Sequence, residues 1–243
     1  DFRRALPEAT VYVYDNNSHD RTRETERAAG AIVGSETMQG KGNVVRRMFA
    51  DIEADVYIMV DGDDTYDADA APELVSTLLE QRLDMVSARR VEEVENAYRS
   101  GHRFGNMLLS GMIRVIFGDR YRDVLSGYRV MSRRFVKSFP ALAGGFEIEA
   151  ELTIHALELR VPTMDVDTQY RARPEGSVSK LRTYHDGARI CLTILHLLKE
   201  ERPFLFFGSI FALLALASIG ISVPIVITYL HTGLVPRLPT AVL

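Results

Sequence analysis

Cysteine occurs once in the 243-residue sequence, at Cys191, so no disulfide can form within one chain. A protein without internal disulfides suits a reducing compartment such as the cytosol. Basic tracts are also lacking, and the formal net charge of −4 argues against a nucleic-acid-binding protein. The sequence has no signal peptide, and its first residues are typical of a helix end and a loop, so we expect the chain to begin inside a domain.

Charged residues are lacking from Phe204 to Leu230. As a helix this stretch would be about 40 Å long, enough to cross a bilayer core of about 30 Å with some tilt. A buried core helix is the alternative. Lys199 and Arg202 precede the stretch, whereas Arg237 is the only charged residue after it. The positive-inside rule therefore predicts that the residues before this transmembrane segment lie in the cytoplasm, at the inner membrane of the cell.

The chain is expected to have three parts. Residues 1–182 form a folded domain, and residues 203–243 hold the transmembrane segment and the start of a possible second one. Between them, apolar residues recur among charged ones over 183–202. This pattern predicts an amphipathic helix that lies in the membrane interface or packs against the domain.

The first part alternates strands and helices. Strands are predicted over Thr10–Tyr14, Ala31–Gly34, Val56–Val60 and Leu83–Ala88, and helices over Arg21–Ala29, Lys41–Ile52 and Pro72–Gln81. This alternation with short connections predicts an α/β fold whose sheet is mostly parallel and has helices on both faces. Ligands gather at the carboxyl ends of the strands in such folds, and Asp15 and Asp61 fall at two of these ends.

Three carboxylates surround one glycine directly after the third predicted strand, at Asp61, Asp63 and Asp64. Because like charges so close together repel one another, such a cluster needs a cation or a hydrogen-bonded turn. A metal site and an Asx-type turn are therefore the two interpretations of this segment.

The Gly40-Lys41-Gly42 segment suggests a nucleotide diphosphate site beside these acids. A metal would neutralise the diphosphate, Lys41 could add a point charge, and Asp15 could hydrogen-bond the base or the ribose. Gly-Lys-Gly is also a common turn and lacks the spacing of a Walker loop, so it indicates a phosphate site only in combination with the acids.

Six segments together resemble family 2 glycosyltransferases, and among them the polyprenyl-phosphate sugar synthases. Asp61-Gly-Asp63 resembles the family's Asp-x-Asp motif, and Gly40-Lys41-Gly42 its Gly-Lys-Gly. The segment Asp-Val-Leu-Ser-Gly-Tyr-Arg, from Asp123 to Arg129, is similar to the Asp-x-x-Ser-Gly-Phe-Arg motif of the synthases. The other matches are Asp15–Thr22 with Asp-Asp-Gly-Ser-x-Asp-x-Thr, Ser87–Arg89 with Gly-Ser-Arg, and Arg173–Lys180 with Arg-x-x-Gly-x-Ser-Lys.

The resemblance implies a GT-A fold, with a Rossmann-like, mixed but mostly parallel sheet. It also implies inverting transfer of a sugar from a UDP- or GDP-sugar to a polyprenyl phosphate in the membrane. Asp61 and Asp63 would hold Mg²⁺ or Mn²⁺ where negative charge grows on the leaving phosphate, and Asp15 and Lys41 would also bind the donor. The role of Asp64 and the formation of a homo-oligomer are left open.

An anionic acceptor requires cations near these carboxylates. The matched motifs supply the candidate phosphate-binding residues Arg89, Arg129, Arg173, Ser179 and Lys180. A surface ion pair is the alternative for each arginine. Asp123 and Arg129 are the catalytic candidates. Because the second pKa of a phosphate monoester is about 6, the acceptor is mostly ionised at neutral pH, so Asp123 is assigned to positioning as much as to base catalysis.

A helix is also expected from Phe146 to Leu159, with Glu147, Glu149 and Glu151 in its first turns. Acids at this end of a helix meet its dipole favourably, so capping is the simpler interpretation. Glu149 could also touch the sugar or the acceptor. The roles of Glu147 and Glu149 are left open.

The sequence departs from the family before its first predicted strand. Family members open with a strand and a Pro-x-x-Asn-Glu loop that contacts the nucleotide, and nothing before Thr10 matches it. We therefore expect the 1–182 domain to be truncated at its N-terminus or to use another residue for this contact.

Two other functional classes stay open. The segment from Asp61 to Thr65 also meets the Asp-x-Asp-x-Thr signature of haloacid dehalogenase phosphohydrolases, in which Asp61 would be the nucleophile. That signature belongs on the first strand of its fold, whereas at least two strands are expected to precede it here. An inactive, membrane-anchored scaffold is the other alternative. The sugar, the nucleotide base and the lipid chain are not legible in the sequence.

Overall fold

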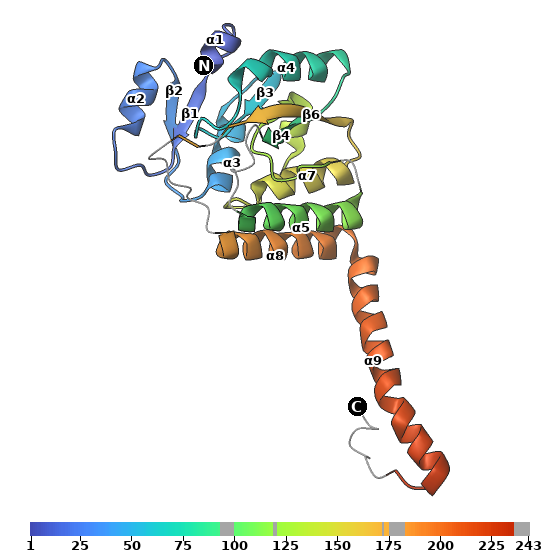
Figure 1. The fold of residues 1–243 in the computed structure, drawn as a ribbon. Coiled ribbons are helices and arrows are strands. Elements are labelled where there is room, and N and C mark those ends of the chain that lie inside the picture. The colour runs from blue at the N-terminus through green and yellow to red at the C-terminus, as the bar shows by residue number, and fades with distance from the viewer. Residues whose placement is uncertain (93–99, 119–120, 172, 175–182, 236–243) are drawn as a thin grey trace. The chain divides into compact units, whose positions relative to one another are not determined.

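A computed structural model describes residues 1–92, 100–118, 121–171, 173–174 and 183–235 (Figure 1). The chain divides into two compact units, residues 1–194 and 195–243. The strands described in the first unit are β1 (Tyr12–Asp15), β2 (Ile32–Ser35), β3 (Val56–Met59), β4 (Met85–Glu92), β5 (Arg129–Ser132) and β6 (Thr163–Tyr170). Its helices are α1 (Phe2–Ala5), α2 (Thr22–Ala28), α3 (Lys41–Asp51), α4 (Ala71–Glu80), α5 (Ser100–Phe117), α6 (Arg133–Ser138) and α7 (Ile148–Glu158). The boundary between the units falls within α8 (Thr183–Glu201), and α9 (Pro203–Thr232) belongs to the second unit.

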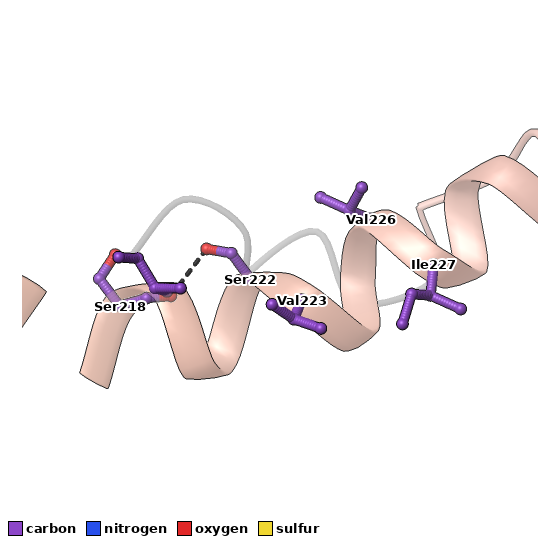
Figure 2. Close-up of a pocket in the computed structure, with 6 residues that line it drawn as sticks. Ser218, Ser222, Val223, Val226 and Ile227 are labelled. Carbon is purple, nitrogen blue, oxygen red and sulfur yellow. Dashed lines mark hydrogen bonds between the residues drawn. The ribbon is translucent and has the colours of Figure 1, made fainter. Parts of the chain in front are cut away.

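The second unit is dominated by α9, a helix of 30 residues. At 1.5 Å per residue such a helix is about 45 Å long, more than a bilayer core of about 30 Å requires. None of the residues of α9, all of which the structure describes, is buried within the protein. Among the described residues α9 is the one helix long and apolar enough to cross a membrane. Figure 2 shows a shallow hollow on its surface at Ser218 and Ser222, which lacks titratable side chains and so carries no chemistry.

The described strands form two sheets. β1 and β2 pair in parallel, and the other strands form a sheet in the order β3-β5-β4-β6. β5 runs antiparallel to both of its neighbours, whereas β4 and β6 are parallel. β3, β4 and β6 therefore point in the same direction, and the larger sheet is mixed with one reversed strand.

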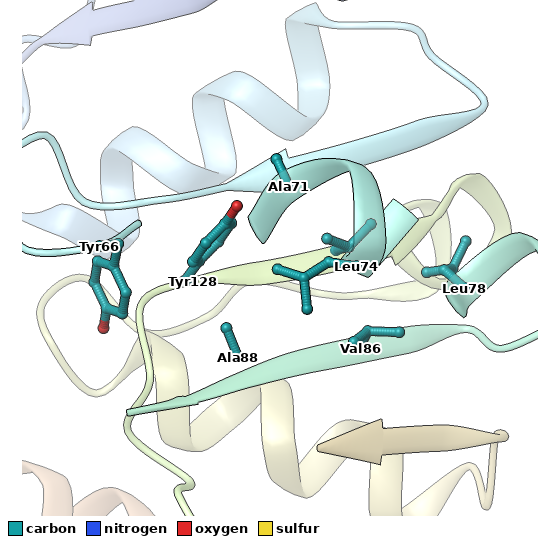
Figure 3. Close-up of a cluster of buried hydrophobic side chains, with 8 residues drawn as sticks. Tyr66, Ala71, Leu74, Leu78, Val86, Ala88 and Tyr128 are labelled. Atoms are coloured by element: carbon teal, nitrogen blue, oxygen red, sulfur yellow. The ribbon is translucent and has the colours of Figure 1, made fainter. Parts of the chain in front are cut away.

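One face of the larger sheet is covered by α4 (Figure 3). Leu74 and Leu78 lie one helical turn apart on α4, so both point toward the sheet and are buried against it. The tyrosines at the end of this cluster, Tyr66 and Tyr128, meet edge to face with ring centroids 5.5 Å apart. The buried cluster consists of Tyr66, Ala71, Leu74, Leu78, Val86, Ala88, Tyr128 and Val130.

The opposite face of the sheet is covered by α7. Successive residues of a strand point to opposite faces, so Val130 of β5 faces α4 while Arg129 faces α7. α7 is buried on nearly all sides, including its glutamates Glu149 and Glu151, and α5 packs against it (Figure 1). The sheet thus lies between helices on both faces, as expected.

Each strand and helix expected from the sequence is present within a few residues of its predicted bounds. The α/β fold with a mixed, mostly parallel sheet and a C-terminal apolar helix is therefore confirmed. The expected amphipathic helix corresponds to α8, in which Ile190 is buried and Leu192 is exposed. Its location in a membrane interface stays a prediction.

Candidate active site

The Gly40-Lys41-Gly42 segment packs against the loop that precedes α7. A Cβ atom at Gly40 would overlap the carbonyl oxygen of Gly144, and a Cβ atom at Gly42 would overlap that of Ala143. The φ angle of Gly40 is 131°, a conformation that residues with side chains rarely adopt. These glycines are therefore explained by a close approach of two backbone segments, and this approach carries Lys41 to the N-terminal end of α7.

Asn16, directly after β1, holds the same loop from the other side. Its Oδ1 accepts a hydrogen bond from the Gly40 amide (2.7 Å). Its Nδ2 donates to the carbonyl oxygens of Glu36 (2.7 Å) and Met38 (2.8 Å). Asn16 lies within the Asp15–Thr22 segment that resembles a family motif, but no role was assigned to it from the sequence. The structure shows that Asn16 fixes the connection between β2 and α3, and with it the start of α3 at Lys41.

Lys41 bridges two carboxylates from distant parts of the chain. Its Nζ donates to Oδ1 of Asp61, 20 positions away, and to Oε1 of Glu149, 108 positions away. The side chains of Lys41 and Glu149 are only 18% and 6% exposed. Burial disfavours the ammonium, but the negative charges of Glu149 and Asp61 outweigh it and raise the pKa of Lys41. Lys41 is therefore a permanent cation beside the acids of the predicted donor site.

Asp61 lies directly against the Ser126-Gly127 segment. A Cβ atom at Gly127 would overlap the carboxylate of Asp61, and the Gly127 amide donates to the hydroxyl of Tyr66 (2.9 Å). Burial raises the pKa of Tyr66 to about 12, so this hydroxyl stays protonated at neutral pH. The Asp-x-Asp segment and the Asp123–Arg129 segment are thus neighbours in space.

Asp63 uses its two carboxylate oxygens differently. Oδ1 accepts hydrogen bonds from the hydroxyl (2.6 Å) and the amide (3.3 Å) of Thr65, forming an Asx turn in which Asp64 has a φ of 58°. Oδ2 accepts from Nη2 of Arg173 (2.5 Å). A hydrogen-bonded turn and a compensating cation are therefore both present at this strand end, so the two interpretations of the acid cluster do not exclude each other.

The available oxygen ligands suit a hard divalent cation with an open coordination sphere. Mg²⁺ and Mn²⁺ prefer carboxylate oxygens, and Asp61 and Asp63 each attract one side-chain cation. Within the described part of the chain, no group of three or more His, Cys, Asp or Glu side chains could hold a metal ion. The two carboxylates thus fit a metal whose remaining ligands are phosphate oxygens or water, and not a cage built by the protein alone.

Asp123 is nearly buried and is held by Arg90. The guanidinium donates through Nε (2.7 Å) and Nη2 (2.8 Å) to the two carboxylate oxygens, and it lies over the ring of Tyr170. Such a bidentate pair fixes both the orientation and the negative charge of the carboxylate. This arrangement favours positioning over base catalysis for Asp123. Arg90 was not among the predicted residues, because the resemblance pointed to its neighbour Arg89.

Arg129 is fully buried between β5 and α7. Its guanidinium donates to the carbonyl oxygens of Val124 (2.8 Å) and Ser126 (3.0 Å) and to Oγ1 of Thr153 (2.8 Å). These bonds fix the backbone of the Asp123–Arg129 segment and connect it to α7. The predicted contact of Arg129 with an acceptor phosphate does not fit this burial, since its donors already point at groups of the fold.

The other predicted residues are distributed as follows. The Asp15 side chain is fully buried and pairs with Arg23 (2.6 Å), so a contact with the base or ribose would require this partner to be exchanged. Arg89 forms an ion pair with Asp167, whose side chain is 56% exposed, which is the surface pair weighed as its alternative. Ser179 and Lys180 lie outside the described residues.

The glutamates at the start of α7 tie loops together. Glu147 pairs with Arg189 of α8 (2.7 Å) and makes no side-chain cap hydrogen bond, contrary to the simpler interpretation. Glu151 accepts from the amides of Leu142 (2.9 Å) and Ala143 (2.8 Å). Glu149 reaches Lys41, and within the described structure its Oε2 is buried without a hydrogen-bond partner. From the sequence, a contact of Glu149 with the sugar or the acceptor was an open alternative, and the contact with Lys41 was not predicted.

Comparison with known proteins settles the family. The model of glycosyl transferase family 2 matches residues 3–139, more than half of the chain. The chain is a family 2 glycosyltransferase. The match includes the Asp61–Thr65 segment, and β1 and β2 precede that segment, so the phosphohydrolase alternative is set aside.

Two relatives of this glycosyltransferase come from Haloferax volcanii. The glycosyltransferase AglJ is 34% identical over 203 residues, which are 83% of this chain and 67% of AglJ. A dolichyl-phosphate hexose transferase is 27% identical over 187 residues, 77% of this chain and 80% of the relative. Among solved structures, glucosyl-3-phosphoglycerate synthase from Mycobacterium tuberculosis, in complex with Mn²⁺, UDP and phosphoglyceric acid, aligns with a TM-score of 0.63 at 22% identity. That alignment covers 79% of this chain and 68% of the synthase, and it supports the GT-A fold.

Proposed function

We propose that this glycosyltransferase moves a sugar from a UDP- or GDP-sugar to a polyprenyl phosphate, with inversion at the anomeric carbon. The observation that carries the acceptor assignment is α9, a 30-residue apolar helix in the same chain as the site. An enzyme fixed to a membrane meets a lipid acceptor at high local concentration. The similarity to a dolichyl-phosphate hexose transferase supports the same acceptor class.

The donor is held by the acids and cations around Lys41. Asp61 and Asp63 would hold Mg²⁺ or Mn²⁺, which when bound neutralises negative charge on the leaving nucleotide diphosphate. Lys41 and Arg173 lie on the same two carboxylates and supply further positive charge for the phosphates. The neighbouring fold of glucosyl-3-phosphoglycerate synthase was solved with Mn²⁺ and UDP, which supports this assignment of the donor side.

The acceptor phosphate is itself the nucleophile. With a second pKa of about 6 it is mostly ionised at neutral pH, so it attacks the anomeric carbon without a strong base. The bond from that carbon to the diphosphate oxygen breaks, and its electron pair leaves with the nucleotide.

Asp123, fixed by Arg90, orients the segment that carries Gly127 beside Asp61. Arg89, Ser179 and Lys180 are proposed to attract the acceptor phosphate, whereas Arg173, which pairs with Asp63, is proposed to serve the donor side.

The catalytic domain is proposed to lie on the cytoplasmic side of the inner membrane. Lys199 and Arg202 precede α9, and Arg237 is the only charged residue after it in the sequence, which supports this orientation under the positive-inside rule. The exposed Leu192 and Leu195 of α8 support a contact of this helix with the membrane interface.

The acceptor assignment is tested by comparing three acceptors with the protein in nanodiscs. The full chain receives a panel of UDP- and GDP-sugars together with polyprenyl phosphate, polyprenol or 3-phosphoglycerate. Of the three acceptors, we expect only polyprenyl phosphate to yield product. NMR should show that the anomeric configuration of the product is opposite to that of the donor. Product from 3-phosphoglycerate without lipid product would contradict the proposed acceptor.

A further inference from the structure

Both carboxylates of the candidate metal site already have a cation on one oxygen. Lys41 Nζ pairs with Oδ1 of Asp61, and Arg173 Nη2 pairs with Oδ2 of Asp63 (2.5 Å). All of these side chains are at most one-third exposed, from 18% for Lys41 to 33% for Asp61. Ion pairs in such positions are weakly screened by solvent, so a divalent metal that binds these oxygens has to replace two side-chain cations.

Lys41 and Arg173 differ in the ion pairs that remain to them once a metal binds Asp61 and Asp63. Lys41 also pairs with Oε1 of Glu149, which is 6% exposed, so it keeps a buried partner when Asp61 is taken by a metal. Arg173 has no second carboxylate among its described contacts, and its side chain is 32% exposed. Arg173 is therefore the group that can swing most readily toward an incoming anion.

We propose that Lys41 and Arg173 are internal counter-ions that make metal binding and nucleotide binding interdependent at this site. A metal that binds these oxygens without nucleotide must leave Lys41 with Glu149 alone and Arg173 without a carboxylate partner among the described residues, and therefore binds weakly. A nucleotide diphosphate offers oxygens to the metal and to the displaced cations at once, so the metal and the diphosphate bind together much more tightly than either alone. The proposal rests on the donor side of the proposed function and makes no use of the lipid acceptor.

Arg173→Gln is the decisive variant, because it removes one counter-ion from a partly exposed position and keeps a polar, uncharged side chain there. Arg171→Gln is the matched control. Arg171 is two residues away and pairs with Asp67 (3.2 Å), just beyond the acid cluster, so this change removes the same charge without freeing Asp63. Lys41→Gln is less suitable, since it would leave Glu149 buried without its cation.

Binding of Mn²⁺ is measured by electron paramagnetic resonance on the full chain in nanodiscs, without nucleotide and with UDP or GDP. For the wild type we expect the nucleotide to tighten Mn²⁺ binding at least about tenfold. In Arg173→Gln, Mn²⁺ alone should bind about tenfold more tightly than in the wild type, and the further gain from nucleotide should shrink. Arg171→Gln should stay within about twofold of the wild type, because long-range surface charges are screened.

Unchanged or weaker binding of Mn²⁺ alone by Arg173→Gln would overturn the proposal, and so would an equal gain in the Arg171→Gln control. Absence of Mn²⁺ binding by any variant, with or without nucleotide, would overturn it as well and would remove the metal from the proposed function. Failure of transfer to polyprenyl phosphate with the expected Mn²⁺ binding would instead contradict only the acceptor assignment. The two failures are therefore distinguishable.

Discussion

Gly127 lies so close to Asp61 that a Cβ atom at position 127 would occupy the space of the Asp61 carboxylate. The two residues belong to segments that resemble separate motifs, the Asp-x-Asp motif of the family and the Asp-x-x-Ser-Gly-Phe-Arg motif of the polyprenyl-phosphate sugar synthases. Their contact places the donor side and the acceptor side of the proposed reaction next to each other. A substitution in either segment should therefore shift side chains of the other segment.

Gly127→Ala should lower transfer at least about tenfold, because the added methyl group displaces the Asp61 carboxylate from its position. The fold should persist, since Gly127 has no positive φ that would strain an alanine. Gly111→Ala in α5 is the control, because a Cβ atom there meets nothing within 4 Å. Transfer rates and melting temperatures of both variants are compared. Full activity of Gly127→Ala would mean that the Asp61 carboxylate need not stay where the structure places it.

Arg129→Met should destabilise the protein by about 2–3 kcal/mol. The change leaves the buried carbonyl oxygen of Ser126 without its donor and removes one of the two donors of the Val124 carbonyl oxygen, and an unsatisfied buried group costs about 1–3 kcal/mol. Arg89→Met, which removes a partly exposed pair with Asp167, should cost about 1 kcal/mol or less. Chemical unfolding of the two variants checks the contrast. A stable Arg129→Met with a raised KM for the acceptor would restore the predicted phosphate contact.

Asp15→Asn should reduce stability at neutral pH by about 1–3 kcal/mol and should flatten the loss of stability in acid. Hydrogen bonds from Ser18 and the charge of Arg23 lower the pKa of Asp15 from its ordinary 3.8, despite burial. This contribution is complete above pH 3.8 and disappears as the pH falls through the lowered pKa, so the two proteins should converge in strong acid. Unfolding free energies measured from pH 7 down into strong acid, well below pH 3.8, test this. A raised donor KM at unchanged stability would instead support a nucleotide contact.

Asp123→Asn should retain more than a few percent of the wild-type rate with polyprenyl phosphate. Asparagine keeps the shape of the side chain and one acceptor for Arg90, and an ionised phosphate needs no base. The rate is measured across neutral pH with saturating donor. A rate below one part in about 1,000, with loss of the acidic limb of the pH profile, would assign base catalysis to Asp123.

Local patterns in the sequence were sufficient for most of the helices and strands that frame the site. The apolar Val56–Met59 strand before the acids and the helix that begins at Lys41 are both found where expected. β5 was missed because it has four residues, starts with a charged arginine and was taken as part of a motif. β6 was missed because Asp165 and Asp167 interrupt its apolar residues, and their compensation by groups on other elements is not visible locally.

The site itself was only partly predictable. Asp61, Lys41 and Asp63 were identified from the strand end, the Gly-Lys-Gly segment and the family resemblance, and the structure brings Lys41 onto Asp61. Glu149 joins them from 108 positions away through a loop packing that depends on the glycines at 40 and 42. Sequence spacing carries no information about such a contact. The burial of Arg129 likewise follows from α7 lying over β5, which no local pattern encodes.

The most direct test of the whole account is metal-dependent transfer of a radiolabelled sugar from its nucleotide diphosphate to polyprenyl phosphate in nanodiscs. The wild type should form a lipid-linked sugar only with Mg²⁺ or Mn²⁺ present. Asp63→Ala should reduce its formation at least about 100-fold, whereas Asp64→Asn, which changes an exposed neighbour and keeps a residue that tolerates a positive φ, should stay within about threefold. Lipid-linked product at the same rate in Asp63→Ala, or no lipid-linked product from any donor, would contradict the account.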